Sequence, residues 1–362
     1  MSYLAIFLSF LVSAGLALIL TPIFAKIAIK FDIVDRPNNR KIHSDPKPYL
    51  GGLAIFFSAG IAYLIFWPEH DYQLGIILGA FIMLLIGFLD DKYDLKPLVK
   101  LAGQILAAVA VVSSGLLIEK FNLPFFGEVE LNNISVIVTI VWIVAVSNAI
   151  NLIDGLDGLA AGVATIALLS ICIMAIGDGI IYVAILCAIL IGANLGFLFY
   201  NFHPAKIYMG DSGALFLGYM ISVISMLGLF KNVALFSFII PLLILAVPFF
   251  DTIFAIVRRL RNGENIMTAD RKHIHYQLLD RGISHRGAVV IIYFFSALFG
   301  LLAIFFSYST LGASIIIVFI AYLLIHIIAE IVGLVLGGKQ PVLNFFRQLL
   351  KSKEAGVKDD KK

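Results

Sequence analysis

Long apolar stretches separated by short polar connections recur along the whole chain. As a helix, a stretch of about twenty residues is long enough to cross a hydrocarbon layer of roughly 30 Å. Inside a bilayer such a segment has to be helical, because every backbone polar group needs a hydrogen-bond partner within the segment. The pattern predicts about eleven transmembrane helices, over Tyr3–Phe24, Leu50–Trp67, Gln73–Leu89, Leu98–Ile118, Ile134–Ile150, Leu159–Ile176, Ile180–Tyr200, Ser212–Phe230, Ala234–Val257, Ala288–Phe306 and Leu311–Leu336.

The composition excludes an ordinary soluble domain. Of the 362 residues, 61% are hydrophobic and 14% are charged, and the mean hydropathy is +1.02. A soluble domain usually has about a quarter of its residues charged. We therefore expect an all-α polytopic membrane protein, with residues 1–336 as one transmembrane domain and residues 337–362 as a basic amphipathic and disordered cytoplasmic tail. The first apolar segment has no basic leader and is expected to remain as a span.

The basic residues predict how the chain is oriented. If the amino terminus is outside, the inner connections and the tail hold 24 of the 26 lysines and arginines. Cytoplasmic connections carry such an excess, so the carboxyl terminus is expected in the cytoplasm. The longest outer connection, residues 119–133, predicts a small external β-hairpin. The net charge of +3 is mild, and no nucleic-acid partner is expected.

Acids, amides and histidines gather in five inner connections. The orientation, derived from basic residues alone, puts all five on one face of the membrane, and ionisable residues at the ends of apolar helices usually mark function. The pattern therefore favours a single cytoplasmic site. Its candidate residues, in chain order, are Lys41, His43, Asp90, Asp91, Asn148, Asn151, Asp154, Asp157, Lys206, Asp211, Asp251, Arg271, Lys272, His273 and His275.

These residue types favour phosphate chemistry with a divalent ion. Carboxylate and amide oxygens without thiolates suit Mg²⁺, or Mn²⁺, better than zinc, and Asp211 and Asn151 are the candidate metal ligands. One short run offers hydrogen-bond donors to phosphate groups: Arg271, Lys272, His273 and His275. Phosphoryl transfer depends chiefly on positioning and charge neutralisation. The residues thus predict metal-dependent phosphoryl chemistry without identifying the substrate.

Each motif also has a structural alternative. Asp90 and Asp91 can simply end a span in headgroup water, and Asp157 can cap a helix after a plain turn. His43 and His203 are open between structural and functional use. None of these alternatives explains the clustering on one face. Topology or packing roles are expected for Arg258, Arg259, Arg261, Cys172, Cys187, His326 and Glu330.

Four motifs resemble those of the polyprenyl-phosphate N-acetylhexosamine-1-phosphate transferases, glycosyltransferase family 4. They are an Asp-Asp after the third span, Asn-x-x-Asn-x-x-Asp-Gly-x-Asp-Gly, Gly-Asp-Ser-Gly, and a His-x-His after the ninth span, in this order. The resemblance implies that undecaprenyl phosphate attacks the β-phosphorus of a UDP-sugar and releases UMP. It implies an enzyme of the bacterial inner (cytoplasmic) membrane that starts surface or cell-wall glycan synthesis. It leaves open whether the enzyme is a homodimer.

The resemblance also implies roles by position. Asp211 matches the main Mg²⁺ ligand, Asn151 lies near the metal and diphosphate, and Asp90 is the candidate base. The implied catalytic residues are Asp90, Asp91, Asp154, Asp157, His273 and His275. The implied substrate contacts are Lys41, His43, Asn148, Asn151, Lys206, Asp251, Arg271 and Lys272.

The donor sugar is open between two branches of the family. His273-Ile-His275-Tyr276 is closer to the branch that uses UDP-N-acetylglucosamine for enterobacterial common antigen, O-antigen and teichoic acid linkage units. The muramoyl-pentapeptide branch usually has a longer histidine run, and the first branch often has a histidine where Tyr276 stands. A transporter is the alternative from another class. It would place ionisable residues at mid-membrane in broken, repeated helices, which this chain does not suggest.

Overall fold

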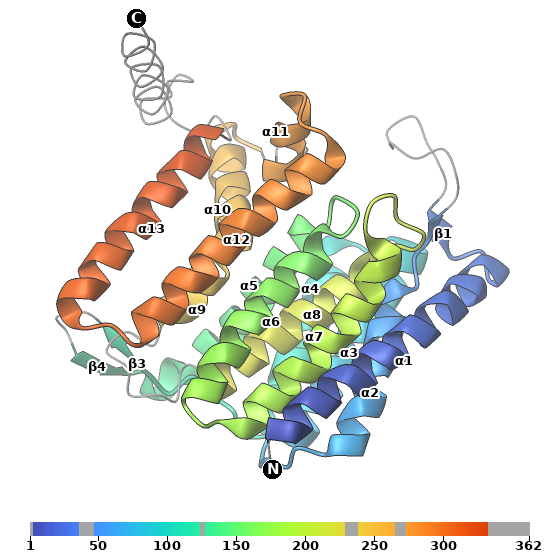
Figure 1. Ribbon diagram of the computed structural model, residues 1–362. Helices are drawn as coiled ribbons and strands as arrows, with labels where there is room; N and C mark the ends of the chain where they lie inside the picture. Colours follow the sequence, from blue (N-terminus) through green and yellow to red (C-terminus); the bar gives the residue numbers. More distant parts are fainter. Residues whose placement is uncertain (1–2, 36–46, 124–126, 229–237, 265–272, 332–362) are drawn as a thin grey trace, which may run out of the picture.

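The computed structural model describes residues 3–35, 47–123, 127–228, 238–264 and 273–331. Within these ranges the chain is a helical bundle with two small pairs of strands (Figure 1). The helices are α1 (Tyr3–Lys30), α2 (Gly51–Phe66), α3 (Gln73–Tyr93), α4 (Pro97–Ser113), η1 (Asn132–Ile134), α5 (Ser135–Ile153), α6 (Leu159–Gly177), α7 (Ile181–Asn201), α8 (Gly210–Gly228), α9 (Ile239–Ile244), α10 (Ala246–Arg261), α11 (Ile274–Asp280), α12 (His285–Ser307) and α13 (Leu311–Ile331). The strands are β1 (Val34–Asp35), β2 (Lys47–Pro48), β3 (Lys120–Leu123) and β4 (Gly127–Glu130).

The helices establish a polytopic membrane protein. In the described part of the chain, eight are long and apolar enough to cross a membrane by length and composition: α1, α3, α5 with the preceding η1, α6, α7, α8, α12 and α13. Helices α2 and α4 are apolar but shorter. The chain is thus an all-α membrane protein, while eleven crossings and the orientation stay predictions.

The segment predicted as a ninth continuous span is interrupted. Helix α9 ends at Ile244, and α10 begins after Leu245. The cause is Pro248, whose ring has no N–H to donate and clashes with the carbonyl four residues earlier, at Ile244. Asp251 lies about one turn after the proline, inside α10.

Two helices extend beyond their apolar stretches and carry the predicted site residues with them. Helix α3 continues to Tyr93, so Asp90 and Asp91 lie in its final turns and not in a connection. Helix α5 continues to Ile153 and includes Asn151. Hydropathy marks where the apolar surface ends, whereas a helix ends where the backbone leaves the helical conformation. Helix α3 ends in this way at Asp94, which is in the left-handed region with a φ of 51°.

Helix α8 lies at the centre of the bundle, buried along nearly its whole length against α2, α3, α5, α6 and α7. Helix α3 approaches it very closely at Gly87, where an added Cβ would lie 2.4 Å from the Cα of Ser212. Because Asp90 and Asp91 follow Gly87 by about one helical turn, this contact brings the acids of α3 beside the start of α8 and Asp211.

The polar connections meet at one end of the bundle. Figure 1 shows β1 and α11 at this end, and the amino terminus with β3 and β4 at the other. Strands β1 and β2 pair antiparallel, and the end of β2 contacts the connection before α8: Tyr208 N donates to Pro48 O at 2.8 Å. The residues predicted to form a hairpin contain β3 and β4, which pair antiparallel with Lys120 opposite Glu130.

Candidate active site

Four helices each contribute one side chain to a polar cluster around Lys100. Lys100 lies in α4, and its Nζ atom donates to three oxygens. They are Asp90 Oδ2 of α3, at 2.8 Å, Asn151 Oδ1 of α5, at 3.1 Å, and Asp211 Oδ2 of α8. Asn151 Nδ2 also donates to Asp211 Oδ1 at 2.7 Å. The structure therefore brings together three predicted residues that lie far apart in the sequence.

Asp91 has a different position from its neighbour Asp90. Its carboxylate accepts hydrogen bonds from the backbone N–H groups of Asp211, at 2.7 Å, and Ser212, at 3.1 Å. The first N–H groups of a helix have no partner within the helix, and a carboxylate there also interacts favourably with the helix dipole. Asp91 thus caps α8 from a neighbouring helix and fixes the place of Asp211. Its predicted catalytic role stays a prediction.

The oxygens of this cluster fit a hard divalent cation. Asp90, Asn151 and Asp211 all direct an oxygen at one positive group, the Lys100 ammonium. Carboxylate and amide oxygens, without sulfur or imidazole nitrogen, are the donors that Mg²⁺ takes, with one or two carboxylates and substrate phosphates completing its shell. The predicted ligands Asp211 and Asn151, together with Asp90, are the residues that would hold such an ion.

Contacts among Asp157, His203 and His285 connect three segments of the chain. Asp157 Oδ2 contacts His203 Nδ1 at 2.8 Å and accepts from Ala205 N at 3.0 Å, while Asp157 N donates to His285 Nε2 at 3.0 Å. The two imidazoles stack at 4.1 Å. Ligand atoms of the three residues lie within 4.8 Å of one another, as in a metal site. In this structure the three residues link the connection after α5, the connection after α7 and the start of α12. The predicted catalytic role of Asp157 stays a prediction.

Asp251 orients His273 and is itself buried. Its carboxylate contacts His273 Nδ1 at 2.9 Å and accepts from Ile274 N at 2.8 Å. Both side chains are more than nine-tenths buried. The arrangement fixes the imidazole plane and leaves Nε2 for another partner, as a carboxylate does for a histidine in metal and catalytic sites. The structure places Asp251 beside His273, and its predicted contact with substrate stays a prediction.

His275 links the histidine segment, residues 273–275, to the connection between α5 and α6. An added Cβ at Gly155 would lie 2.1 Å from His275 Nε2, so only glycine permits this approach. Neither ring nitrogen of His275 has a hydrogen-bond partner in the described structure. Burial lowers the pKa of His275 to about 4, and its imidazole is therefore neutral at pH 7.

Partly buried acids shape the electrostatics near Asp154. Burial, with the negative charges of Asp211 and Asp157, raises the pKa of Asp154 to about 7. Burial and the charges of Asp91, Asp154 and Asp211 also raise the pKa of Tyr49. An excess of negative charge that raises pKa values in this way favours a cation in the same region.

The remaining predicted residues lie in other surroundings. Asn148 is paired with Gln104 of α4, donating from Nδ2 to Gln104 Oε1 at 2.6 Å. The side chain of Lys206 is exposed. Lys41, His43, Arg271 and Lys272 lie outside the described residues, so their predicted contacts remain untested, as does the predicted tail.

Sequence reasoning missed two contributors to this region. Lys100 was counted only among the basic residues that set the orientation, although it is the one basic residue within α4. His285 was not considered, because it lies at the beginning of α12, ten residues beyond His275. A charged residue on the buried side of an apolar helix was the available signal for Lys100.

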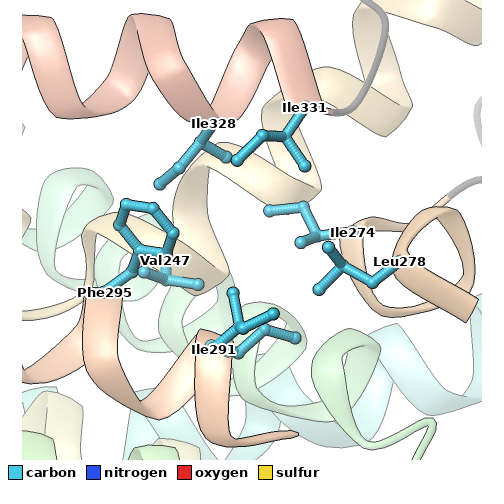
Figure 2. Close-up of a pocket in the computed structure, with 8 residues that line it drawn as sticks. Val247, Ile274, Leu278, Ile291, Phe295, Ile328 and Ile331 are labelled. Atoms are coloured by element: carbon cyan, nitrogen blue, oxygen red, sulfur yellow. The ribbon is translucent and has the colours of Figure 1, made fainter. Parts of the chain in front are cut away.

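An apolar pocket lies behind the histidine segment. Figure 2 shows Val247, Ile274, Leu278, Ile291, Phe295, Ile328 and Ile331, from α10, α11, α12 and α13, around it. Its lining has no polar atoms, so it is not a place for phosphate groups. The polar cluster around Lys100 comes from other helices, α3, α4, α5 and α8.

Comparison with known proteins gives the same assignment as the motifs. Residues 73–229 match the family described as glycosyl transferase family 4. A relative from Bacillus subtilis, named a probable undecaprenyl-phosphate N-acetylglucosaminyl 1-phosphate transferase, is 46% identical over 349 residues, which cover 96% of this chain and 97% of the relative. The decaprenyl-phosphate N-acetylglucosaminephosphotransferase of Mycolicibacterium smegmatis is 33% identical over 74% of this chain and 73% of its own.

A third relative extends the similarity to another bacterium. The undecaprenyl-phosphate alpha-N-acetylglucosaminyl 1-phosphate transferase of Pasteurella multocida is 35% identical over 298 residues, or 80% of this chain and 83% of the relative. The matched residues include the α3, α4, α5 and α8 side chains that meet at Lys100. The chain therefore belongs to glycosyl transferase family 4, as its four motifs predicted.

Proposed function

We propose that this protein transfers N-acetylglucosamine-1-phosphate from UDP-N-acetylglucosamine to undecaprenyl phosphate and releases UMP. The relatives that cover most of the chain are named for N-acetylglucosamine-phosphate transfer to a polyprenyl phosphate. The observation that carries the proposal is the convergence of Asp90, Asn151 and Asp211 on one cationic position. Anionic diphosphate chemistry needs such a position, because the acids alone would repel the substrate.

Each residue of the cluster has a distinct task in this proposal. A bound Mg²⁺ supplies neutralisation of the diphosphate charge. Asp211 and Asn151 hold the ion, and Asp91 keeps Asp211 at the start of α8 through its two backbone hydrogen bonds. Asp90 contacts the Lys100 ammonium from α3 and is the candidate to orient or deprotonate the lipid phosphate. A one-step displacement and a covalent intermediate are both compatible with this set.

The histidine segment is proposed to contact the diphosphate and the sugar. Asp251 holds His273 so that its Nε2 atom can meet an oxygen of the donor. His275, neutral and without a hydrogen-bond partner in the described structure, lies against Gly155 in the Asp-Gly motif. A neutral imidazole can donate one hydrogen bond and accept another, which suits sugar hydroxyl and acetamido groups.

The proposal places the site at the cytoplasmic face of a bacterial inner membrane. In support, the connections and the tail that are predicted to face the cytoplasm hold 24 of the 26 lysines and arginines, and β1 and α11 lie at one end of the bundle. UDP-sugars are water-soluble, so the donor would enter from that side, while the lipid acceptor would approach within the membrane. The pair β3 and β4 would then lie outside.

A panel of donors tests the proposed substrate. The purified full-length protein is mixed with undecaprenyl phosphate and either UDP-N-acetylglucosamine, UDP-N-acetylgalactosamine or UDP-N-acetylmuramoyl-pentapeptide, and the lipid product is identified by mass spectrometry. We expect product from UDP-N-acetylglucosamine at a rate at least tenfold above the other donors. Product only from the muramoyl-pentapeptide donor would assign the chain to the peptidoglycan branch. No lipid product from any donor would refute transfer to this acceptor.

Replacing Asp251 with asparagine should slow turnover by about 10- to 100-fold, the usual effect of losing a residue that orients a site histidine. Asparagine keeps the size of the side chain and can still accept from Ile274 N, but it removes the negative charge beside His273. Steady-state rates with saturating donor measure the effect. Asp280→Asn, an exposed change at the end of α11, is the matched control. Equal rates for Asp251→Asn and wild type would contradict the supporting role.

The raised pKa of Asp154 predicts how stability depends on pH. In the folded protein this carboxyl keeps its proton up to about pH 7, whereas in the unfolded chain it loses it near its ordinary pKa of 3.8. The folded state therefore binds the extra proton, and stability falls as pH rises from about 4 to about 7. In metal-free detergent solution, Asp154→Asn should raise the unfolding temperature at pH 8 and change it little at pH 4. The exposed Asp71→Asn should change neither. An equal effect of Asp154→Asn at both pH values would contradict the assigned pKa.

A further inference from the structure

Lys100 occupies the position that a divalent cation would need. Its side chain is 16% exposed, and its ammonium is in hydrogen-bond contact with oxygens of Asp90, Asn151 and Asp211. Two of these three partners carry a negative charge in their ionised form. The proposed function assigns the same three side chains to Mg²⁺, so the inference below rests on that function.

The neighbouring lysines show that this placement is specific to Lys100. Lys96, one turn earlier at the start of α4, is exposed. Lys92 in the last turn of α3 lies 5.1 Å from the centre of the Tyr93 ring. Among the described lysines of this region, Lys100 alone contacts both Asp90 and Asp211. Proximity to the membrane surface therefore does not account for its contacts.

A lysine ammonium and a divalent ion cannot both make close contacts with these oxygens. Mg²⁺ binds oxygen at about 2.0–2.1 Å and demands nearly octahedral geometry. An ammonium already in contact with Asp211 Oδ2 would then lie within a few ångströms of a doubly charged ion, and like charges at such a distance repel strongly in a partly buried site. Conversely, with neither cation present, the negative charges of Asp90 and Asp211 would lie close together without a positive charge to neutralise them.

We propose that Lys100 is a positioning residue that acts as a built-in counter-cation. In the metal-free protein its ammonium holds the oxygens of Asp90, Asn151 and Asp211 in place, and a divalent ion binds by displacing it from Asp211. The lysine thereby keeps the three oxygens in place before the ion binds. It also weakens metal binding, because the free energy needed to displace the ammonium reduces the net binding free energy of the ion.

Metal binding without substrate tests this exchange. The purified full-length protein, free of nucleotide and lipid substrate, is titrated with Mn²⁺ and with Mg²⁺ by calorimetry and by the shift of the unfolding temperature. Lys100→Gln should bind the ion at least tenfold more tightly than wild type, and its metal-free form should unfold at a lower temperature. Lys96→Gln removes a nearby exposed charge and should match wild type. A purely structural lysine would give weaker metal binding in Lys100→Gln.

Labelling of the wild type keeps the test independent of the variant's folding. An amine-reactive acylating reagent, followed by mass spectrometry, measures the reactivity of Lys100 with Lys96 and Lys92 as internal references. We expect Mg²⁺ to raise the labelling of Lys100 severalfold at constant labelling of the references. Unchanged labelling, or metal affinity that is equal or lower in Lys100→Gln, overturns the proposal. Wild type that binds neither ion would instead refute the metal site of the proposed function.

Discussion

Asp211→Asn is expected to reduce UMP release by about 10³-fold or more, the scale of losing a group that stabilises charge during phosphoryl transfer. Asparagine has nearly the same shape, but its single side-chain oxygen can replace only one of the two carboxylate oxygens that accept from Lys100 and Asn151. It lacks the negative charge that would hold the divalent ion. The loss should persist at saturating concentrations of both substrates. Rates of UMP release at graded free Mg²⁺ measure it.

Two comparisons separate this effect from misfolding. The variant should unfold within a few degrees of wild type, because Asp91 binds the backbone and not the side chain of Asp211. Asp94→Asn is the matched control, since Asp94 is exposed one turn after Asp90 and asparagine readily adopts its left-handed conformation. Asp94→Asn should retain normal activity. Near-normal, Mg²⁺-dependent UMP release by Asp211→Asn would show that the metal ligands have been assigned wrongly.

Gly87→Ala is expected to lower both stability and activity although it changes no polar group. The added methyl group would meet backbone atoms of Ser212 at 2.4 and 2.5 Å and the carbonyl carbon of Asp211 at 2.6 Å. Backbone cannot rotate away as a flexible side chain can, so α3 and α8 must separate. Overpacking of this kind costs about 1–3 kcal/mol. The displacement also moves Asp211 relative to Asp90, and we expect a loss of activity of about 10²-fold.

The control for this variant is Gly60→Ala. Gly60 lies in α2, and an added Cβ there would meet nothing within 4 Å. Both variants replace a helical glycine with a better helix former, so their difference isolates the α3–α8 contact. Unfolding temperature and UMP release are measured for both. Wild-type activity in Gly87→Ala would mean that the close approach of the two helices does not position the site.

The hydropathy pattern identified the type of fold but not the ends of its helices. It predicted an all-α membrane protein, and the described helices agree. It placed Asp90 and Asn151 in connections, whereas both lie within helices that outlast their apolar surface. It also treated the ninth segment as continuous, although Pro248 was a visible reason for the break at Leu245.

The candidate site was predictable where residue type alone carries the chemistry. Asp90, Asn151 and Asp211 were singled out as acids and an amide in a motif, and the structure brings them together. The sequence could not separate Asp91 from Asp90, because which carboxylate caps α8 depends on how two helices pack. Nor could it assign Lys100 to the cluster or Asp251 to His273, since both contacts join residues from different helices or segments.

The identity of the released nucleotide tests the central claim most directly. The purified protein is given UDP-N-acetylglucosamine and undecaprenyl phosphate, with Mg²⁺ or with a chelator, and the nucleotide products are separated and quantified against the lipid product. We predict one UMP for each lipid-linked diphosphate sugar formed, and neither product with the chelator. Release of UDP in place of UMP, or equal turnover without a divalent ion, would contradict phosphoryl transfer at a metal held by these oxygens.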